Sequence, residues 1–167
     1  MEMRKKKMAE NCIFRYSLKN AWGLPLSWIE VLDRDNNNVR VYRFNNGAWN
    51  GDTDIIKPET VTVSPAVIVQ VKEILRQHPE ILRISGTEEP PELEGVKAHL
   101  LFADGENSSE ITSENLWYFE DKEAKDAQGN EPVRAWTVLK IFNKIKDVLL
   151  KAGIDPYYLT LYYHEED

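Results

Sequence analysis

The chain has 167 residues, of which 42% are hydrophobic and 29% are charged, and its formal net charge at pH 7 is −7. This length and composition suit one globular domain with its own hydrophobic core and argue against a disordered chain. The single cysteine, Cys12, excludes an intrachain disulfide. Because no apolar run has the length of a secretory signal or a membrane span, we expect a cytoplasmic protein with no membrane partner.

The charge is unevenly distributed along the chain. Residues 1–44 carry nine Lys/Arg against five Asp/Glu, whereas residues 86–131 carry thirteen Asp/Glu against three Lys. We expect residues 1–11 to form a flexible basic tail and residues 12–167 to form a single α+β domain. An acidic chain repels the phosphates of nucleic acid, so no nucleic-acid partner is predicted.

The N-terminal third has the pattern of β-strands. Residues 12–18 alternate weakly between apolar and polar side chains and predict a first strand. Two further strand-like runs, 26–33 and 39–44, flank an asparagine-rich segment at 34–38. Because asparagine adopts left-handed backbone at low cost, this segment predicts the turn of a β-hairpin.

A long loop and a helix are expected next. Residues 45–60 are polar and contain two Asn-Gly pairs and Pro58, which predicts a loop. Ser64 and Pro65 then provide a helix start, and Pro79 limits the end of that helix. Its expected buried side chains recur at helical spacing: Val67, Ile68, Val71, Ile74 and Leu75.

Short apolar runs in the second half predict further strands. The run at 81–84 predicts a short strand, and the alternating tyrosines of 157–163 predict a final strand. The runs at 98–103 and 116–119 predict a hairpin with a long polar loop at 104–115.

The clearest predicted element is a helix over residues 133–152. Glu131 and Pro132 favour its start, and Gly153 favours its end. Its broad apolar face requires cover from more than one side, and consists of Ala135, Val138, Leu139, Ile141, Phe142, Ile145, Val148, Leu149, Leu150 and Ala152. We therefore predict an α+β fold, a mainly antiparallel sheet with two amphipathic helices packed on one face.

The chain contains none of the common catalytic or nucleotide-binding motifs. No GxSxG, P-loop, GxGxxG or HExxH pattern occurs, and His78, His99 and His164 are not in a metal-binding spacing. We predict no catalytic residue, no metal and no cofactor.

Two groups of residues are candidates for ligand or partner binding. Aromatic residues crowd the N-terminal third, and two tryptophans lie in predicted loops near a carboxylate pair. The acidic stretch could steer a basic partner. The candidate residues are Trp22, Trp49, Asp52, Asp54, His99, Glu88, Glu89, Glu92 and Glu94.

These features predict a non-enzymatic interaction protein, an inhibitor or an adaptor, which binds a protein with a basic surface. The alternative is a small-molecule binding domain or small enzyme with an aromatic-lined pocket, in which His99 and Asp52 or Asp54 supply the polar groups. A third hypothesis is a homo-oligomer that pairs through the tyrosine-rich final strand. The sequence leaves the oligomeric state open.

Overall fold

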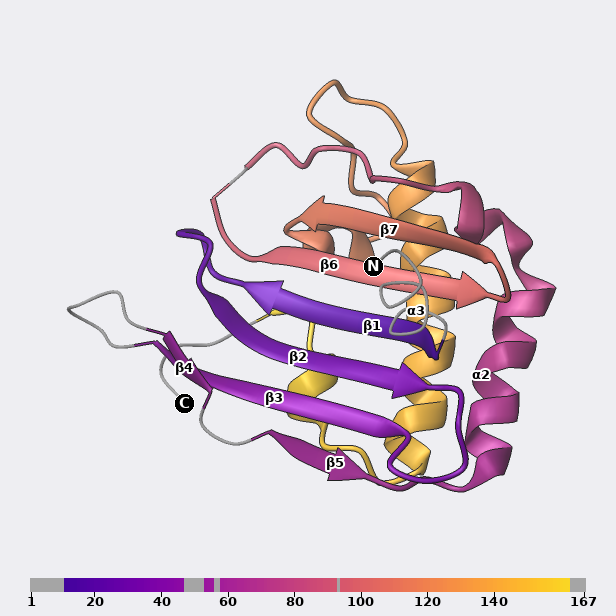
Figure 1. The fold of residues 1–167 in the computed structure, drawn as a ribbon. Coiled ribbons are helices and arrows are strands. Elements are labelled where there is room, and N and C mark those ends of the chain that lie inside the picture. Colours follow the sequence, from indigo (N-terminus) through magenta and orange to yellow (C-terminus); the bar gives the residue numbers. More distant parts are fainter. Residues whose placement is uncertain (1–10, 47–52, 56–57, 93, 163–167) are drawn as a thin grey trace.

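A computed structural model describes residues 11–46, 53–55, 58–92 and 94–162 of the chain. An antiparallel sheet contains, in spatial order, β4 (Thr53–Ile55), β3 (Val39–Asn46), β2 (Pro25–Leu32), β1 (Cys12–Lys19), β6 (Lys97–Asp104) and β7 (Asn107–Glu114), and β5 (Glu59–Val61) also pairs with β3. Helix α3 (Val133–Lys151) crosses behind the strands and α2 (Pro65–Gln77) lies beside it, so both helices cover the same face of the sheet (Figure 1). The predicted α+β class, antiparallel sheet and two-helix layer are confirmed.

Strands β1 (Cys12–Lys19), β2 (Pro25–Leu32) and β3 (Val39–Asn46) form an antiparallel meander. The hairpin predicted between β2 and β3 is confirmed, and Asn37 in its turn has the left-handed backbone that asparagine tolerates (φ 52°). The neighbouring Asn38 is fully buried, and its side chain exchanges two hydrogen bonds with the backbone of Val63, at 2.8 and 2.9 Å. This contact joins the hairpin turn to the segment that enters α2.

The region predicted as a loop at 45–60 includes two short strands. β4 (Thr53–Ile55) pairs with the end of β3, and β5 (Glu59–Val61) pairs with its beginning. The loop prediction is therefore wrong for these residues, because backbone pairing with β3 supplies order that their polar side chains do not indicate.

Helix α2 (Pro65–Gln77) begins and ends close to its predicted limits. The Ser64 hydroxyl accepts a hydrogen bond from the Ala66 amide at 3.2 Å, which satisfies one of the free N–H groups of the first turn. Ile68, Val71 and Leu75 are buried at the spacing of one helix face.

Strands β6 (Lys97–Asp104) and β7 (Asn107–Glu114) form a tight hairpin. The prediction of β6 is confirmed, but the prediction of a loop at 104–115 is wrong. The helix-facing side of β7 holds Ile111 between Ser109 and Ser113, so the strand lacks an apolar alternation. Its position is set by backbone pairing with β6 rather than by hydrophobic patterning.

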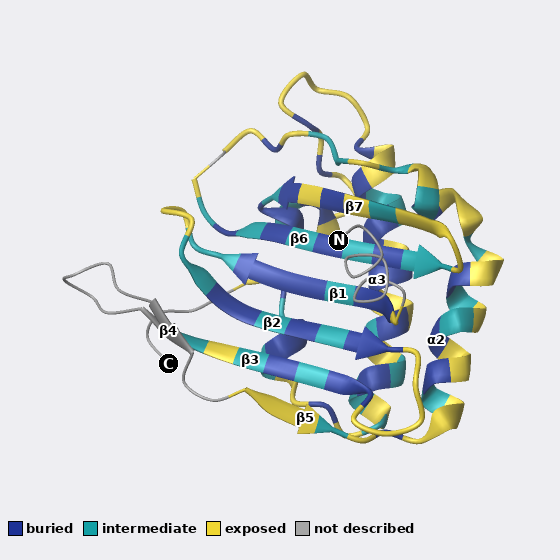
Figure 2. Cartoon of the chain, viewed as in Figure 1, coloured by how far each residue is buried: buried dark blue, intermediate teal, exposed yellow. Residues whose placement is uncertain are grey.

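Helix α3 (Val133–Lys151) confirms the predicted main helix. Its buried side chains all belong to the predicted apolar face: Ala135, Val138, Leu139, Ile141, Phe142, Ile145 and Leu149. The rings of Phe142 and Tyr16 lie 4.7 Å apart, which places α3 directly on β1. Figure 2 shows the buried residues concentrated along the central strands and on the sides of the helices that face them.

Three segments predicted as strands are 3-10 helices: η1 (Pro79–Arg83), η2 (Leu116–Glu120) and η3 (Pro156–Leu159). In η2 the buried residues Leu116 and Phe119 are three apart, which is the period of a 3-10 helix. In η3 the Asp155 side chain accepts a hydrogen bond from the Tyr157 amide at 2.9 Å. Residues 157–162 thus form no strand, which removes the basis for the predicted pairing of copies through this segment.

The expected basic tail lies almost entirely outside the described residues, which begin at Asn11. Within the described ranges, no helix combines the length and the apolar character needed to cross a membrane.

Candidate functional site

Trp22 lies in the turn between β1 and β2 and is 80% exposed. The turn is fastened by the Asn20 side chain, whose Oδ1 accepts hydrogen bonds from the amides of Trp22 at 3.0 Å and Leu24 at 2.9 Å. The Asn20 amide donates to the Leu24 carbonyl at 2.8 Å, and Gly23 adopts a left-handed conformation (φ 83°). The tryptophan is therefore presented to solvent from an ordered turn.

The side of the sheet opposite the helices carries a second set of polar and aromatic side chains, which we call the open face. Tyr16 and Leu18 of β1 are buried beneath the helix layer, so the alternate residues of β1 and their register partners lie on the other side. No helix of the described chain covers this side (Figure 1). The open face comprises Arg15, Ser17, Lys19, Trp28, Glu30, Arg40, Tyr42, Lys97, His99, Leu101, Glu110, Thr112 and Glu114.

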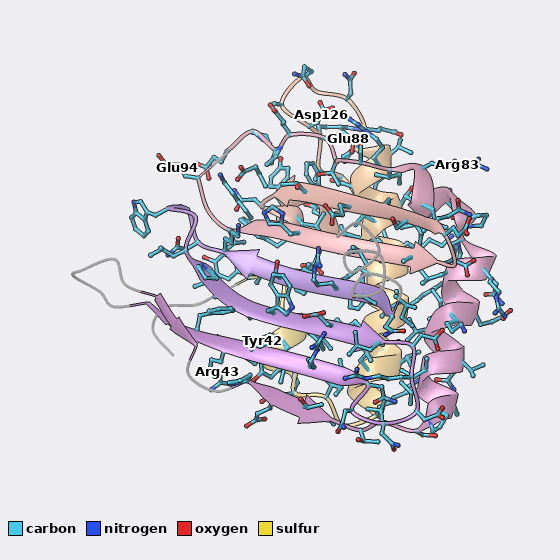
Figure 3. The ribbon with its side chains drawn as sticks, viewed as in Figure 1. Tyr42, Arg43, Arg83, Glu88, Glu94 and Asp126 are labelled. Atoms are coloured by element: carbon cyan, nitrogen blue, oxygen red, sulfur yellow. The ribbon has the colours of Figure 1, made fainter. Side chains whose placement is uncertain are left out.

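Trp28 is held in a fixed orientation on the open face. Its Nε1 donates a hydrogen bond to Glu30 Oε1 at 2.7 Å, and Glu30 Oε2 pairs with an Arg40 nitrogen at 3.3 Å. The Arg15 guanidinium lies 5.0 Å from the centroid of the Trp28 ring, a cation–π arrangement. The ring of Tyr42, which Figure 3 labels on β3, meets Trp28 edge-on at 6.4 Å.

His99, a predicted candidate, lies on β6 in the middle of the open face. Its Nδ1 is 3.4 Å from the Thr112 hydroxyl on β7. Partial burial lowers the pKa of His99, and the nearby cations Lys19, Lys97 and Arg15 lower it further. The imidazole is consequently neutral at pH 7.

Exposed carboxylates occur along two segments of the chain, 89–94 and 120–123, and we call this set the acidic patch. The Ala127 amide donates to the Glu89 carbonyl at 2.8 Å, and the Asn115 side chain donates to the carbonyls of Glu92 and Glu94 at 3.0 and 2.9 Å. Figure 3 shows Glu88, Glu94 and Asp126 along these connections. The acidic patch comprises Glu89, Glu92, Glu94, Glu120, Asp121 and Glu123.

None of the six patch carboxylates forms an ion pair with a cation of the described chain. Lys125, in the same connection, pairs instead with Glu131 at 3.9 Å. The buried Asp126 shapes this connection, because its Oδ1 accepts hydrogen bonds from the amides of Gln128 and Asn130 at 2.9 and 2.8 Å. The patch therefore combines an ordered backbone with unpaired negative charge.

Glu88 differs from the other predicted acids because it caps a helix. Its carboxylate accepts hydrogen bonds from the amides of Ala135 at 2.9 Å and Arg134 at 3.1 Å, in the first turn of α3. Burial raises the pKa of Glu88, but the hydrogen bonds outweigh burial, and the net pKa lies below the ordinary value. Its side chain is only 11% exposed, so little of it is available to a partner.

The remaining candidates are not brought together with these surfaces. Trp49 and Asp52 lie outside the described residues, and Asp54 lies in β4 opposite Asn45. Among the described residues, no three His, Cys, Asp or Glu gather as ligands for a metal ion.

A small cavity of about 270 Å³ lies at the opposite end of β1 from the Trp22 turn. It is lined by Cys12, Ile13, Asp33, Lys72, Arg76, Ala103, Asp104 and Gly105. Lys72 and Asp33 neutralise each other across 3.0 Å. Burial, with a smaller contribution from the Glu30 carboxylate, raises the pKa of Cys12 to about 11, so its sulfur is a thiol at neutral pH.

Sequence patterns indicated Trp22, His99 and the acidic patch, but not the other open-face residues. Ser17, Lys19 and Lys97 stand in no recognisable motif, and only the register of β1 with β6 brings them beside His99. A comparison of the sequence with models of known protein families and with curated proteins found no match. The chemistry that the surfaces offer is therefore read from their geometry: an exposed aromatic anchor, an ordered polar sheet face and an unpaired acidic patch.

Proposed function

We propose that this chain is a protein-interaction domain of the inhibitor or adaptor kind, which binds a protein with a basic surface through Trp22 and the acidic patch. The observation that carries the proposal is the exposure of Trp22 on an ordered turn. A large aromatic side chain gains free energy when it is buried, and tryptophan is enriched among residues that dominate protein interfaces.

The hydrogen bonds of Asn20 support this role because they reduce the cost of binding. A flexible loop loses conformational entropy when a partner orders it, whereas the Trp22 turn is already ordered by its own contacts. The partner that fits this turn has an apolar pocket that accepts an indole ring.

The acidic patch supports a basic surface around that pocket. Lys19 and Lys97 are register partners on β1 and β6, so the Trp22 turn, which follows Lys19, and the segment 92–96, which precedes Lys97, lie at the same end of the sheet. Glu92 and Glu94 are exposed in this segment. Unpaired carboxylates beside an aromatic anchor attract a positively charged partner and orient it before contact.

The test is a pull-down with the full chain from lysate of its own source, followed by calorimetry with the purified partner. We expect Trp22→Ala to weaken binding at least tenfold, as loss of an interface hot spot does. The matched control is Val69→Ala, which removes a 61% exposed side chain from α2. Equal affinity of Trp22→Ala and the wild-type chain for every captured protein would contradict the proposal.

A second variant tests the acidic patch. Combined Glu89→Lys, Glu92→Lys and Glu94→Lys substitutions reverse three exposed charges whose side chains make no ion pair with the described chain. We expect slower association and a weaker dependence of the rate on salt. The control is Glu73→Lys on α2, an exposed acid away from the patch. Unchanged association of the triple variant would exclude charge steering by this surface.

A further inference from the structure

Four side chains that can donate hydrogen bonds form a square on the open face. Lys19 on β1 is the register partner of Lys97 on β6, and Ser17 is the register partner of His99. Directly opposed residues of an antiparallel pair have their Cβ atoms about 5 Å apart, and both pairs lie on the same side of the sheet because they are two residues apart. The Cβ atoms of two lysines, a serine and a histidine therefore border one region of the open face.

Lys19 and Lys97 lie directly opposite each other, which is unfavourable because like charges across a strand pair repel each other. The neighbouring acid relieves only part of this repulsion. Glu114 pairs with Lys97 at 3.5 Å, whereas Lys19 has no ion-pair partner among the described residues. One positive charge thus remains without a counter-charge from the described part of the chain.

Ser17 adds a hydroxyl donor beside the two lysines. The residue is 4% exposed and faces Trp28 on one side and His99 on the other. An acceptor bound on the open face could receive a hydrogen bond from this hydroxyl.

His99 completes the set of donors. The Thr112 hydroxyl lies beside Nδ1, and when it donates to that atom the ring proton is on Nε2, where it can be given to a ligand. The aromatic wall of Trp28, the register partner of Ser17 on β2, bounds the square on its other side.

We propose that Lys19, Lys97, Ser17 and His99 form a binding site for a single oxyanion, the phosphate or carboxylate group of a small soluble molecule. Oxyanions accept several hydrogen bonds at once, and those from ammonium groups are strengthened by charge. The oxyanion site adjoins the surface proposed for the partner protein at the same end of the sheet but uses different residues, so each proposal is tested by its own variants.

The imidazole of His99 reports directly on occupancy. Burial, and after it the cations Lys19, Lys97 and Arg15, lower the pKa of His99. A bound anion neutralises those cations and favours the imidazolium, so the pKa of His99 rises when the site is filled. A merely structural role of the four residues would produce no such change.

The experiment is an NMR titration of the His99 imidazole in the full chain, with inorganic phosphate and with acetate in separate arms and sodium chloride at matched ionic strength as the reference. We expect saturable shifts of the His99 resonances and a raised His99 pKa with phosphate, acetate or both. The arm with the tighter binding identifies the preferred class of oxyanion. Shifts that are identical to those in sodium chloride would overturn the proposal.

Substitutions of single residues test which side chains bind the oxyanion. We expect Lys19→Gln and Lys97→Gln each to weaken the apparent affinity about fivefold, the effect of losing one partly exposed charge contact. Ser17→Ala should also weaken it, because the variant removes one hydrogen-bond donor from the site. Lys140→Gln, an exposed lysine on α3, is the control and should bind as the wild type does. Equal affinities of Lys19→Gln and Lys140→Gln would place the anion elsewhere.

Discussion

The amide side chain of Asn115 fills the space that a Cβ atom on Gly95 would occupy. Gly95 has a φ of 146°, a conformation that disfavours other residues, and Asn115 itself is left-handed (φ 44°) and only 2% exposed. The Asn115 Oδ1 accepts a hydrogen bond from the Val96 amide at 3.0 Å, and its Nδ2 donates to the segment that carries Glu92 and Glu94. This pair of residues thereby fixes one part of the acidic patch to the end of β7.

Gly95→Ala is expected to lower the free energy of unfolding by roughly 1–3 kcal/mol, the cost of an unfavourable backbone conformation together with displacement of the Asn115 side chain. Urea denaturation measures the loss. The control is Gly129→Ala, because Gly129 also has a positive φ (82°) but a Cβ there would have no atom within 4 Å. If the two variants lose the same stability, the contact with Asn115 contributes nothing.

Glu88→Gln is expected to lower the unfolding free energy by about 1 kcal/mol at neutral pH, since it removes the negative charge at the N-terminus of α3. The folded pKa of Glu88 lies below its ordinary value of 4.5. Its stabilisation is therefore fully present above pH ~5 and is lost as the pH falls through the folded pKa. Denaturation curves at several pH values should show the wild type and the variant converging in acid.

The control for this prediction is Glu131→Gln, because Glu131 also lies near the start of α3 but is exposed and makes only a 3.9 Å ion pair with Lys125. We expect the difference in unfolding free energy between Glu131→Gln and the wild type to change much less with pH. If the unfolding free energies of the wild type and Glu88→Gln differ by the same amount at neutral and at acid pH, the carboxylate charge does not stabilise α3.

The buried Cys12 is expected to resist thiol reagents in the folded protein. With a pKa near 11 against an ordinary value of 9.0, its thiolate fraction at pH 8 is about a hundredfold lower than that of an unfolded chain. The reaction of Cys12 with a chromogenic disulfide, followed by the absorbance of the released thiolate, should therefore be slow in buffer and fast in urea. Equal rates in the two conditions would show that the thiol is neither buried nor raised in pKa.

Hydrophobic patterning predicted those elements whose order comes from packing against the core. The apolar face of α3 and the alternation of β2 are visible in the sequence because every second or every third to fourth side chain must be buried. β7 was missed because Ser109 and Ser113 face inward on either side of Ile111. Pairing with β6, rather than side-chain character, holds that strand in place.

The candidate site was only partly predictable for a similar reason. The exposure of Trp22 follows from a turn that local composition indicates, whereas the capping of α3 by Glu88 joins residues 46 and 47 positions apart. The buried roles of Asn38 and Asn115 also depend on distant backbone groups, at Val63 and at residues 92–96. No local pattern encodes such partners, so an asparagine that bridges two segments has the same appearance in the sequence as one in a solvated turn.

The hydroxyl of Tyr16 fastens the C-terminal segment to the core. Tyr16 is fully buried on β1, and its hydroxyl donates to the Thr160 carbonyl at 2.7 Å. Burial, with a smaller contribution from the Glu120 carboxylate, raises the pKa of this phenol far above its ordinary value of 10.0, so Tyr16 should remain un-ionised until the protein unfolds in alkali. An absorbance titration of the wild type and of Tyr16→Phe isolates this residue, and a Tyr16 signal that titrates near pH 10 in the folded protein would contradict the assignment.

Tyr16→Phe should lower the free energy of unfolding by about 1 kcal/mol and accelerate amide exchange in residues 156–161, because the variant loses a buried hydrogen bond while keeping the ring contact with Phe142. Tyr157→Phe is the matched control, since Tyr157 is only half-buried and its hydroxyl donates to the Leu26 carbonyl at 3.2 Å. We expect Tyr157→Phe to lose less unfolding free energy than Tyr16→Phe, because water can replace a hydrogen-bond partner at a partly exposed group. Should both variants exchange at the wild-type rate, hydrophobic burial of Leu159 and Leu161 alone would account for the docking of this segment.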